Sequence, residues 1–361
     1  MDLIFIPIIL IAVLVVITLI IIWADNFFGT AGERSLIVNE EKEIPVTDSD
    51  TVLNILTKEK IFIPSACGGK ATCGFCKVRV TEGGGEVRPT EEPFLDKEQK
   101  ANNVRLSCQV KVRENIKVEI PKSLLGALEY KAKAIKVEDL TYDTKLVRFK
   151  LIEPDTMEFK PGQYAQIKVP GIEIIRAYSI ASDPKDPHHI EFIIRLVPGG
   201  LATTFVHKAL LAGDDIIITG PYGDFFLRED SKRDMVCIAG GSGKAPIRSI
   251  LYRLQDMGMP RKVRYFFGAK AVKDLYYTEE MQAIAKEFPN FEYIPALSHP
   301  EEDDHWKGET GLITDVLDRM TGDLSESEAY LCGSPGMIDA CIKVLKKHDI
   351  KNENILYDKF G

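Results

Sequence analysis

The sequence has little of what several functional classes require. Lys and Arg number 46 against 54 Asp and Glu, giving a net charge of −8, so the basic surface expected of a nucleic-acid-binding protein is missing. The six histidines form no cluster, and His188-His189 stands in a Pro/Asp loop predicted to be solvated. Neither a carboxylate pair nor a Ser–His–Asp order stands out, so the sequence gives no support for a hydrolase.

Cysteine is scarce and unevenly placed. Of seven cysteines, four lie between positions 67 and 108. An odd count with a tight cluster makes a poor disulfide framework and favours a metal site in a reducing compartment. With 361 residues, 45% hydrophobic and 28% charged, the chain is long enough for two or three globular domains.

One long uncharged run opens the chain, from Leu3 to Ala24, with Trp23 at its end. Its 22 residues reach across a hydrocarbon core of roughly 30 Å. The alternatives are a signal peptide and a buried core helix, but no basic segment precedes the run. We predict a retained transmembrane anchor within residues 1–28. Since Arg34 and Lys42 follow it, the rest of the chain should face the cytoplasm from the inner (cytoplasmic) membrane.

The cysteine cluster carries the first strong motif. Cys67, Cys73, Cys76 and Cys108 have the spacing C-x5-C-x2-C-x31-C. Four thiolates suit a [2Fe–2S] centre, although plant-type ferredoxins have one residue fewer in the first gap. Gly68, Gly69 and Gly74 let backbone N–H groups approach the sulfurs. Structural zinc is the alternative, but zinc sites usually pair two short C-x2–4-C elements. We predict a cluster held by all four cysteines, with a β-hairpin and the helix Thr51–Lys60 before it.

Short β-like stretches then alternate with turns, which predicts an antiparallel barrel; they are Tyr130–Val137, Leu146–Leu151, Tyr164–Val169, Ala177–Ile180 and Ile190–Leu196. Arg176-Ala177-Tyr178-Ser179 matches the R-x-[YF]-[ST] motif of ferredoxin–NADP⁺ reductase-type flavoproteins. This resemblance implies that Arg176 pairs with FAD pyrophosphate, Tyr178 lies against the flavin and Ser179 reaches its N5 edge. Gly200 and Thr203, where a glycine turn opens a helix, stand where that family holds the pyrophosphate. Gly220-Pro221-Tyr222-Gly223 matches the segment that ends the barrel.

The last third of the chain predicts a doubly wound α/β domain. The buried strand Met235–Ala239 precedes the loop Gly240-Gly241-Ser242-Gly243-Lys244-Ala245-Pro246 and a helix. This order is expected for a dinucleotide site, at which Gly240, Gly241, Gly243 and Pro246 would lie. Further strands are predicted at Val263–Gly268, Phe291–Leu297 and Ala329–Gly333, with helices near Tyr277–Phe288, Leu312–Met320 and Met337–His348.

Three more candidates come from the superfamily resemblance. Cys332-Gly333-Ser334-Pro335 matches its C-G-x-P motif, which implies that Cys332 and Gly333 contact the nicotinamide. Phe360 would shield the flavin, with a frayed tail as the alternative. Ser298 follows a strand and would face the ribose or nicotinamide. Ser179, Cys332 and Phe360 are therefore the predicted catalytic residues. Cys237 and Cys341 are interpreted as buried structural cysteines.

The order of these motifs resembles the F subunit of the Na⁺-translocating NADH:quinone oxidoreductases, down to the ending Asn354–Gly361. That family carries a longer insertion before R-A-Y-S; the shorter barrel here resembles the reductase components of phenol-hydroxylase-type monooxygenases. The resemblance implies an anchor, a β-grasp [2Fe–2S] domain over 33–122, an FAD barrel over 127–228 and an NAD domain over 233–361.

The implied activity is transfer of hydride from NADH to FAD and of single electrons through the cluster. The acceptor would be a membrane quinone-reductase complex using ubiquinone, or alternatively a monooxygenase; a non-enzymatic redox module is a third hypothesis. NADH is favoured over NADPH, although Lys270 and Lys273 would suit a 2′-phosphate.

Overall fold

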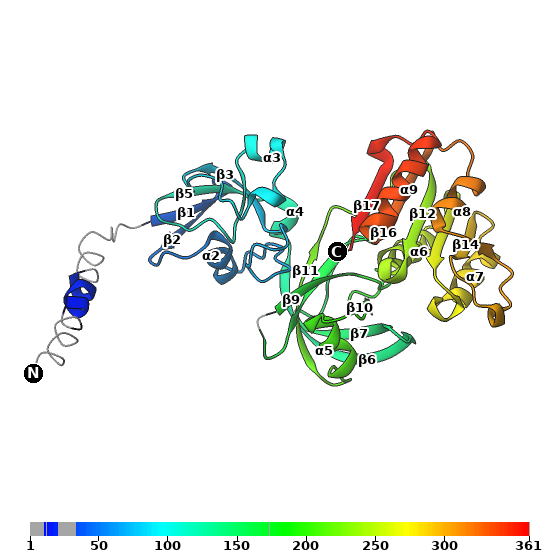
Figure 1. Ribbon diagram of the computed structural model, residues 1–361, viewed down its shortest axis with the longest axis horizontal. Coiled ribbons are helices and arrows are strands. Elements are labelled where there is room, and N and C mark those ends of the chain that lie inside the picture. The colour runs from blue at the N-terminus through cyan, green and yellow to red at the C-terminus, as the bar shows by residue number, and fades with distance from the viewer. Residues whose placement is uncertain (1–10, 12, 21–33, 173, 361) are drawn as a thin grey trace, which may run out of the picture. The chain divides into compact units, whose positions relative to one another are not determined.

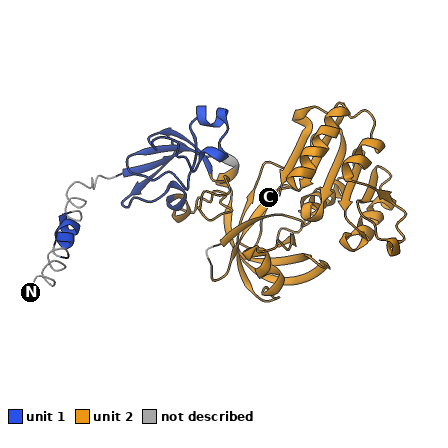
Figure 2. Ribbon diagram, viewed as in Figure 1, with its two compact units in different colours: residues 1–55, 77–120 blue, residues 56–76, 121–361 orange. Residues whose placement is uncertain are grey.

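The structure is a computed structural model that describes residues 11, 13–20, 34–172 and 174–360 (Figure 1). Contacts divide the chain into two compact units, residues 1–55 with 77–120 and residues 56–76 with 121–361 (Figure 2). The predicted span Leu3–Ala24 and its Trp23 lie largely outside the described residues, of which 13–20 are helical. Among the residues described, no helix has the length and apolar character needed to cross a bilayer.

The first unit is built on a five-stranded mixed sheet in the order β2-β1-β5-β3-β4. The predicted hairpin is confirmed as β1 and β2, and β1 also pairs in parallel with β5. Alternate residues of β1 and β2, such as Leu36 and Ile44, are buried, as a one-sided sheet requires. The strands are Arg34–Val38, Lys42–Val46, Lys77–Glu82, Val104–Leu106 and Ile116–Glu119 for β1 to β5, with helices α2 (Val52–Lys58) and α3 (Lys97–Ala101).

A buried ion pair within this unit anchors the segment that precedes Cys108. Arg105 and Glu91 are 3% and 0% exposed, and their closest N–O distance is 2.7 Å. Glu91 also accepts the backbone N–H of Leu106, and the Arg105 guanidinium donates to the carbonyls of Gly84 and Gly85. The pair therefore ties β4 to the glycine turn after β3.

The second unit contains a six-stranded antiparallel sheet in the order β10-β7-β6-β11-β8-β9. A bridge between Ile180 and Phe192 joins its two outer strands, so the sheet curls into the predicted barrel. The sequence analysis missed β11 as a strand. The elements are β6 (Leu128–Thr141), β7 (Thr144–Glu153), β8 (Tyr164–Val169), β9 (Ile174–Ser179), β10 (His189–Arg195), β11 (Asp215–Tyr222), and helices α4 (Lys122–Leu125) and α5 (Leu201–Lys208).

The C-terminal part of this unit is a parallel six-stranded sheet in the order β15-β14-β13-β12-β16-β17. The order reverses between β12 and β16, which makes their carboxyl ends the topological switch point. The strands are β12 (Asp234–Gly240), β13 (Val263–Ala269), β14 (Phe291–Leu297), β15 (Glu309–Thr310), β16 (Ser327–Gly333) and β17 (Ile355–Lys359). The helices are α6 (Lys244–Asp256), α7 (Thr278–Glu287), α8 (Ile313–Met320) and α9 (Pro335–Lys347).

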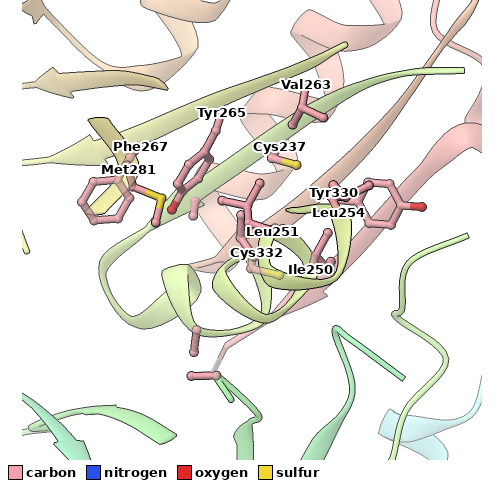
Figure 3. Close-up of a cluster of buried hydrophobic side chains, with 14 of the residues drawn as sticks. Cys237, Ile250, Leu251, Leu254, Val263, Tyr265, Phe267, Met281, Tyr330 and Cys332 are labelled. Carbon is pink, nitrogen blue, oxygen red and sulfur yellow. The ribbon is translucent and has the colours of Figure 1, made fainter. Parts of the chain in front are cut away.

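Helices cover both faces of this parallel sheet, as the doubly wound prediction requires. Residues of α6 and α7 share one apolar cluster with β12 and β13, and Figure 3 shows Ile250 and Leu254 packed near Cys237 and Tyr330. Residues of α8 and α9 share a second cluster on the other face. Cys237 and Cys341 are 0% exposed in these clusters, in agreement with the structural interpretation.

Candidate redox site

The cysteine loop lies in the second unit. The Sγ atoms of Cys67 and Cys73 are 3.4 Å apart, and Cys76 is 1% exposed. Gly68, Gly69 and Gly74 have φ of 64°, 83° and 70°, a left-handed conformation that glycine adopts without strain. Burial alone would raise the pKa of Cys67, but hydrogen bonds from Thr72, Cys73 and Lys70 lower it to about 7. The loop thus favours thiolate at one predicted ligand.

Cys108 lies in the first unit, directly after β4. It is 5% exposed, and the Gln109 side-chain amide donates to its Sγ at 3.6 Å. Across the described residues, no three His, Cys, Asp or Glu side chains gather closely enough to hold a metal ion. Within the second unit the structure therefore brings Cys67 and Cys73 together, whereas Cys108 belongs to the first unit.

Strand β9 presents the flavin motif. Tyr178 packs against Phe192, with ring centroids 6.3 Å apart, and its buried hydroxyl has no hydrogen-bond partner among the described residues. Burial raises the pKa of this phenol to about 12, so the hydroxyl is protonated and available as a donor. Arg176, predicted to meet pyrophosphate, is exposed and donates to the backbone carbonyls of Ala66 and Ile175, both at 2.8 Å. Ala177 is paired with Gln166 of β8, so its backbone helps to hold β9 in the sheet.

Ser179, at the end of β9, meets the C-terminal strand. Its hydroxyl donates to the Asp358 carboxylate at 3.4 Å, and Ser179 is 7% exposed. Asp358 stands opposite Cys332 in the β16–β17 register, and Cys332 is fully buried. Burial raises the pKa of Asp358 to about 6, although the Ser179 hydrogen bond lowers it. Two of the predicted catalytic residues thus flank one carboxylate that sequence reasoning did not assign a role.

Phe360 lies at the end of the same strand. Its backbone N–H donates to the Gly333 carbonyl at 2.9 Å, and its ring packs against the α6–α7 apolar cluster. The alternative of a frayed tail is therefore wrong. A pocket of about 410 Å³ opens beside this strand, and its lining includes Tyr164, Arg228 and Asp358.

Gly200 and Thr203 form the N-terminal turn of α5. The Thr203 hydroxyl accepts the N–H of Val197 at 3.1 Å and donates to the Gly200 carbonyl at 3.1 Å. A Cβ at Gly200 would lie 2.8 Å from that hydroxyl, so a larger residue would displace the Thr203 side chain. In this structure the Thr203 side chain stabilises the turn itself.

The dinucleotide loop lies at the switch point. A Cβ on Gly243 would stand 2.2 Å from the Cys332 carbonyl oxygen, so the loop after β12 packs directly on the end of β16. A Cβ on Gly240 would meet the Met337 sulfur at 2.8 Å. The Tyr276 hydroxyl donates to the Gly241 carbonyl at 2.7 Å, and Pro246 is buried within α6. The structure brings Gly243 and Cys332 together, as the prediction of one nicotinamide site requires.

Ser298 follows β14 at the same carboxyl edge of the sheet. Its hydroxyl contacts the Ala269 carbonyl at 3.4 Å and His299 Nδ1 at 2.9 Å. Two strands separate β14 from β16 in this sheet, since β13 and β12 lie between them. Ser298 is therefore on the predicted edge, and the two intervening strands separate it from the strand that carries Cys332.

Sequence reasoning missed Asp358, Lys244 and Arg248. The one signal for Asp358 was its place two residues before Phe360. Arg248, on α6, donates to Glu191 of β10 at 2.8 Å and to Glu280 of α7 at 3.2 Å, joining the barrel to the parallel sheet. Nothing in the local sequence indicates this role, because the partners come from distant elements.

Comparisons with known proteins give the family. The 2Fe-2S iron-sulfur cluster binding domain family matches residues 36–113, the oxidoreductase FAD-binding domain family 131–227, and the oxidoreductase NAD-binding domain family 237–343. The F subunit of the Na(+)-translocating NADH-quinone reductase of Neisseria meningitidis is 32% identical, with 97% of each chain covered. The chain belongs to this family, within the ferredoxin–NADP⁺ reductase superfamily.

Two further proteins are similar to this chain over most of its length. The phenol hydroxylase P5 protein of Acinetobacter pittii is 37% identical, with 88% of this chain and 91% of that protein covered. The Amycolatopsis cytochrome P450 reductase GcoB has a TM-score of 0.75 and 29% identity, over 91% of this chain and 98% of its own. The chain is thus an NADH-dependent flavin and iron–sulfur oxidoreductase with FAD-, NAD- and [2Fe–2S]-binding domains.

Proposed function

We propose that this chain is the NADH-oxidising component of a membrane-bound electron-transfer complex that reduces a quinone such as ubiquinone. The observation that carries the proposal is the order of cluster, FAD and NAD domains in a chain that aligns over 97% of its length with the F subunit of a Na(+)-translocating NADH-quinone reductase. The domain bounds are the predicted ones, 33–122, 127–228 and 233–361.

The cluster would be held by Cys67, Cys73, Cys76 and Cys108. Thiolate ligands suit a [2Fe–2S] centre, and the positive φ of the loop glycines together with the lowered pKa of Cys67 supports this set. Such a centre accepts and donates one electron at a time when bound. The chain's contribution is to place N–H donors around the sulfurs, which tunes the potential of the centre.

The flavin would lie on β9. The orphaned hydroxyl of Tyr178 supports this proposal, because a buried donor without a partner is costly unless a ligand bonds it. Gly200 and Thr203 would place the N-terminus of α5 at the pyrophosphate. Arg176 would turn from the Ala66 carbonyl toward the same group. FAD when bound accepts hydride and releases electrons singly.

The nicotinamide dinucleotide would bind at the switch point. Gly240, Gly241, Gly243 and Pro246 shape the loop, and Cys332 with Gly333 ends the neighbouring strand, while Ser298 lies at the same edge. Phe360, anchored by its bond to Gly333, would cover the flavin until nicotinamide replaces its ring.

Two side chains of this site, Ser179 and Asp358, would take part in proton transfer. The Ser179 hydroxyl lies at the predicted flavin edge, and Asp358 accepts its hydrogen bond from a buried position. A carboxyl whose pKa is raised to about 6 exchanges protons readily near neutral pH. Asp358 would therefore hold a proton near Ser179, and the fully buried Cys332 would exclude water from the same edge.

Membrane attachment is the second part of the proposal. The uncharged run Leu3–Ala24 has the composition of a single span, and Arg34 and Lys42 follow it. The catalytic domains would face the cytoplasm, and the partners would be the other subunits of the complex.

The alternative acceptor is a multicomponent monooxygenase. The phenol hydroxylase P5 protein is more nearly identical to this chain, at 37%. The alignment with the Neisseria reductase covers 396 positions, more than the 361 residues of this chain, so that relative carries residues without a counterpart here. This difference in length favours the monooxygenase reductases, whereas the N-terminal apolar run favours the membrane complex.

A pull-down of the full-length protein from solubilised membranes tests the proposal. The expected result is copurification of integral membrane subunits and NADH-driven reduction of a quinone analogue by the complex. Copurification of a diiron hydroxylase instead would establish the alternative. NADH–ferricyanide turnover by the purified chain, which needs no partner, separates failure of the enzyme from failure of the partner assignment.

A further inference from the structure

A fully buried lysine directly follows the glycines of the dinucleotide loop. Lys244 is the first residue of α6, follows Gly243 and is 0% exposed. Its Nζ stands 3.8 Å from the ring centroid of Phe267, 4.9 Å from that of Tyr276 and 5.3 Å from that of Tyr293. Figure 3 shows Phe267 and Tyr265 of β13 close to Met281 in this part of the core. Aromatic faces attract a cation, so the surroundings of Nζ suit an ammonium group.

Hydrogen bonds connect Lys244, through Tyr276, to the backbone of the loop. Nζ donates to the Tyr276 carbonyl at 2.6 Å and to the Tyr293 hydroxyl at 3.4 Å. Tyr276 in turn donates its hydroxyl to the Gly241 carbonyl at 2.7 Å. One tyrosine therefore joins the buried ammonium to the backbone of the proposed pyrophosphate loop.

The charges around Lys244 are unbalanced. Among the described residues, no carboxylate forms a hydrogen bond with Nζ, and a helix N-terminus is an unfavourable place for a cation. Glu280 of α7 attracts the charge from a distance and Arg248 of α6 repels it, while Tyr265, Tyr276 and Tyr293 remain protonated because burial raises the pKa of each. Burial lowers the pKa of Lys244 to about 7. A nearby anion is what this buried site lacks.

We propose that Lys244 is a positioning residue whose buried ammonium strengthens binding of the dinucleotide diphosphate at the 240–243 loop, and that this binding draws a proton onto Lys244. The inference rests on the proposed nicotinamide site. The diphosphate supplies the missing negative charge, which favours the protonated lysine. By reciprocity, protonated Lys244 favours the bound dinucleotide.

Calorimetry of the full-length oxidised holoenzyme with NAD⁺ tests the inference without hydride transfer. Titrations near pH 8 in two buffers of different ionisation enthalpy give the number of protons taken up on binding. We expect uptake of a fraction of a proton by the native protein and none by Lys244→Met, which keeps the length of the side chain but removes its charge.

The affinity change should depend on pH. Lys244→Met should weaken NAD⁺ binding by roughly three- to tenfold near pH 6.5, where the lysine is charged, on the basis of a charge interaction at an effective dielectric of about 20. The loss should shrink above about pH 8, where the lysine is mostly neutral. Lys286→Met, which removes an exposed charge from α7, serves as the matched control and should change neither quantity.

Proton uptake that is equal in the native protein and Lys244→Met would overturn the inference, as would a loss of affinity that does not vary with pH, since that indicates a packing role alone. If Lys244→Met does not fold, absence of proton uptake by the native protein in the same experiment overturns it equally. Failure of the native protein to bind NAD⁺ would instead refute the proposed nicotinamide site.

Discussion

At the scale of single residues, the most informative side chains are polar groups that the fold buries at a cost. Asp358 is held beside Ser179 with a pKa raised to about 6, whereas an ordinary aspartate has 3.8. A carboxyl group kept in such a position destabilises the fold when it is ionised. Its presence is therefore better explained by the chemistry at Ser179 than by stability.

Replacement of Asp358 by Asn tests this explanation. Because the folded-state pKa is raised, the native protein loses stability as pH rises through about 6, and Asp358→Asn should remove that loss. We expect the variant to be more stable by roughly 1–2 kcal/mol near pH 8, a value reduced for partial exposure. NADH–ferricyanide kcat should fall by roughly tenfold or more and lose its dependence on a group of pKa about 6.

Thermal melting and pH–rate profiles measure these two effects on the same samples. Asp323→Asn is a suitable control, since Asp323 is exposed and accepts hydrogen bonds from the nearby Ser325. A variant with unchanged kcat and an unchanged pH profile would refute the role of Asp358 in proton transfer.

The Glu91–Arg105 pair gives a second prediction at this scale. Glu91→Gln leaves a buried guanidinium without its charge partner, which typically costs about 3–5 kcal/mol. Glu119→Gln is the matched control, because its pair with Arg79 is half-exposed and such pairs are worth about 0–1 kcal/mol. Chemical denaturation followed by circular dichroism should separate the two variants clearly. Equal unfolding midpoints would show that the buried pair does not hold β4.

At the scale of elements, periodicity predicted the strands that have continuous apolar runs and failed where the pattern is broken. Met235–Ala239 and Ala329–Gly333 are buried on both faces, so their sequences are apolar throughout and β12 and β16 were anticipated. Strand β11 was missed because Gly220-Pro221 lies inside it, where its register with β8 shifts. Strand β17 pairs with a single neighbour and carries the charged residues Asp358 and Lys359. Its sequence therefore lacks the continuous apolar run of a buried strand and resembles that of a C-terminal tail.

The contact between the dinucleotide loop and β16 gives an element-scale prediction. Gly243→Ala would force a Cβ to within 2.2 Å of the Cys332 carbonyl oxygen, so the loop must shift away from the strand end. The KM for NADH should rise by roughly tenfold or more, since a displacement of about 1 Å is costly at a binding site. Gly322→Ala, which meets nothing within 4 Å, should leave the KM unchanged. Steady-state kinetics decide the matter, and an unaltered KM for Gly243→Ala would argue against this loop as the dinucleotide site.

At the scale of the whole molecule, the sequence predicted the order of the domains because each cofactor motif is short and local. Arg176, Tyr178 and Ser179 occupy one strand, and the glycines occupy one loop. Contacts between distant segments escaped prediction: Ser179 with Asp358, Arg248 with Glu191, and Lys244 with Tyr276. Each depends on how strands are ordered, which periodicity does not encode. The cluster ligand set and the membrane span stay predictions.

The N-terminal run gives a prediction about the whole chain. A variant lacking residues 1–28 should remain in the soluble fraction. The full-length protein should stay in the membrane fraction when the membranes are washed with alkaline carbonate. NADH–ferricyanide turnover per flavin should be the same for both, because none of the cofactor motifs lies within residues 1–28. Equal partitioning of the two proteins between membrane and soluble fractions would contradict the proposed anchor.

The central claim is that one chain joins a nicotinamide-reducible flavin to a [2Fe–2S] cluster. The most direct test is anaerobic mixing of the purified protein with NADH, followed by absorbance and electron paramagnetic resonance, on samples analysed for FAD, iron and acid-labile sulfide. We predict one FAD, two irons and two sulfides per chain, with flavin bleaching followed by the signal of a reduced cluster. Cys67→Ser should keep the bleaching and lose that signal. Zinc in place of iron and sulfide, or a flavin that NADH does not reduce, would contradict the account.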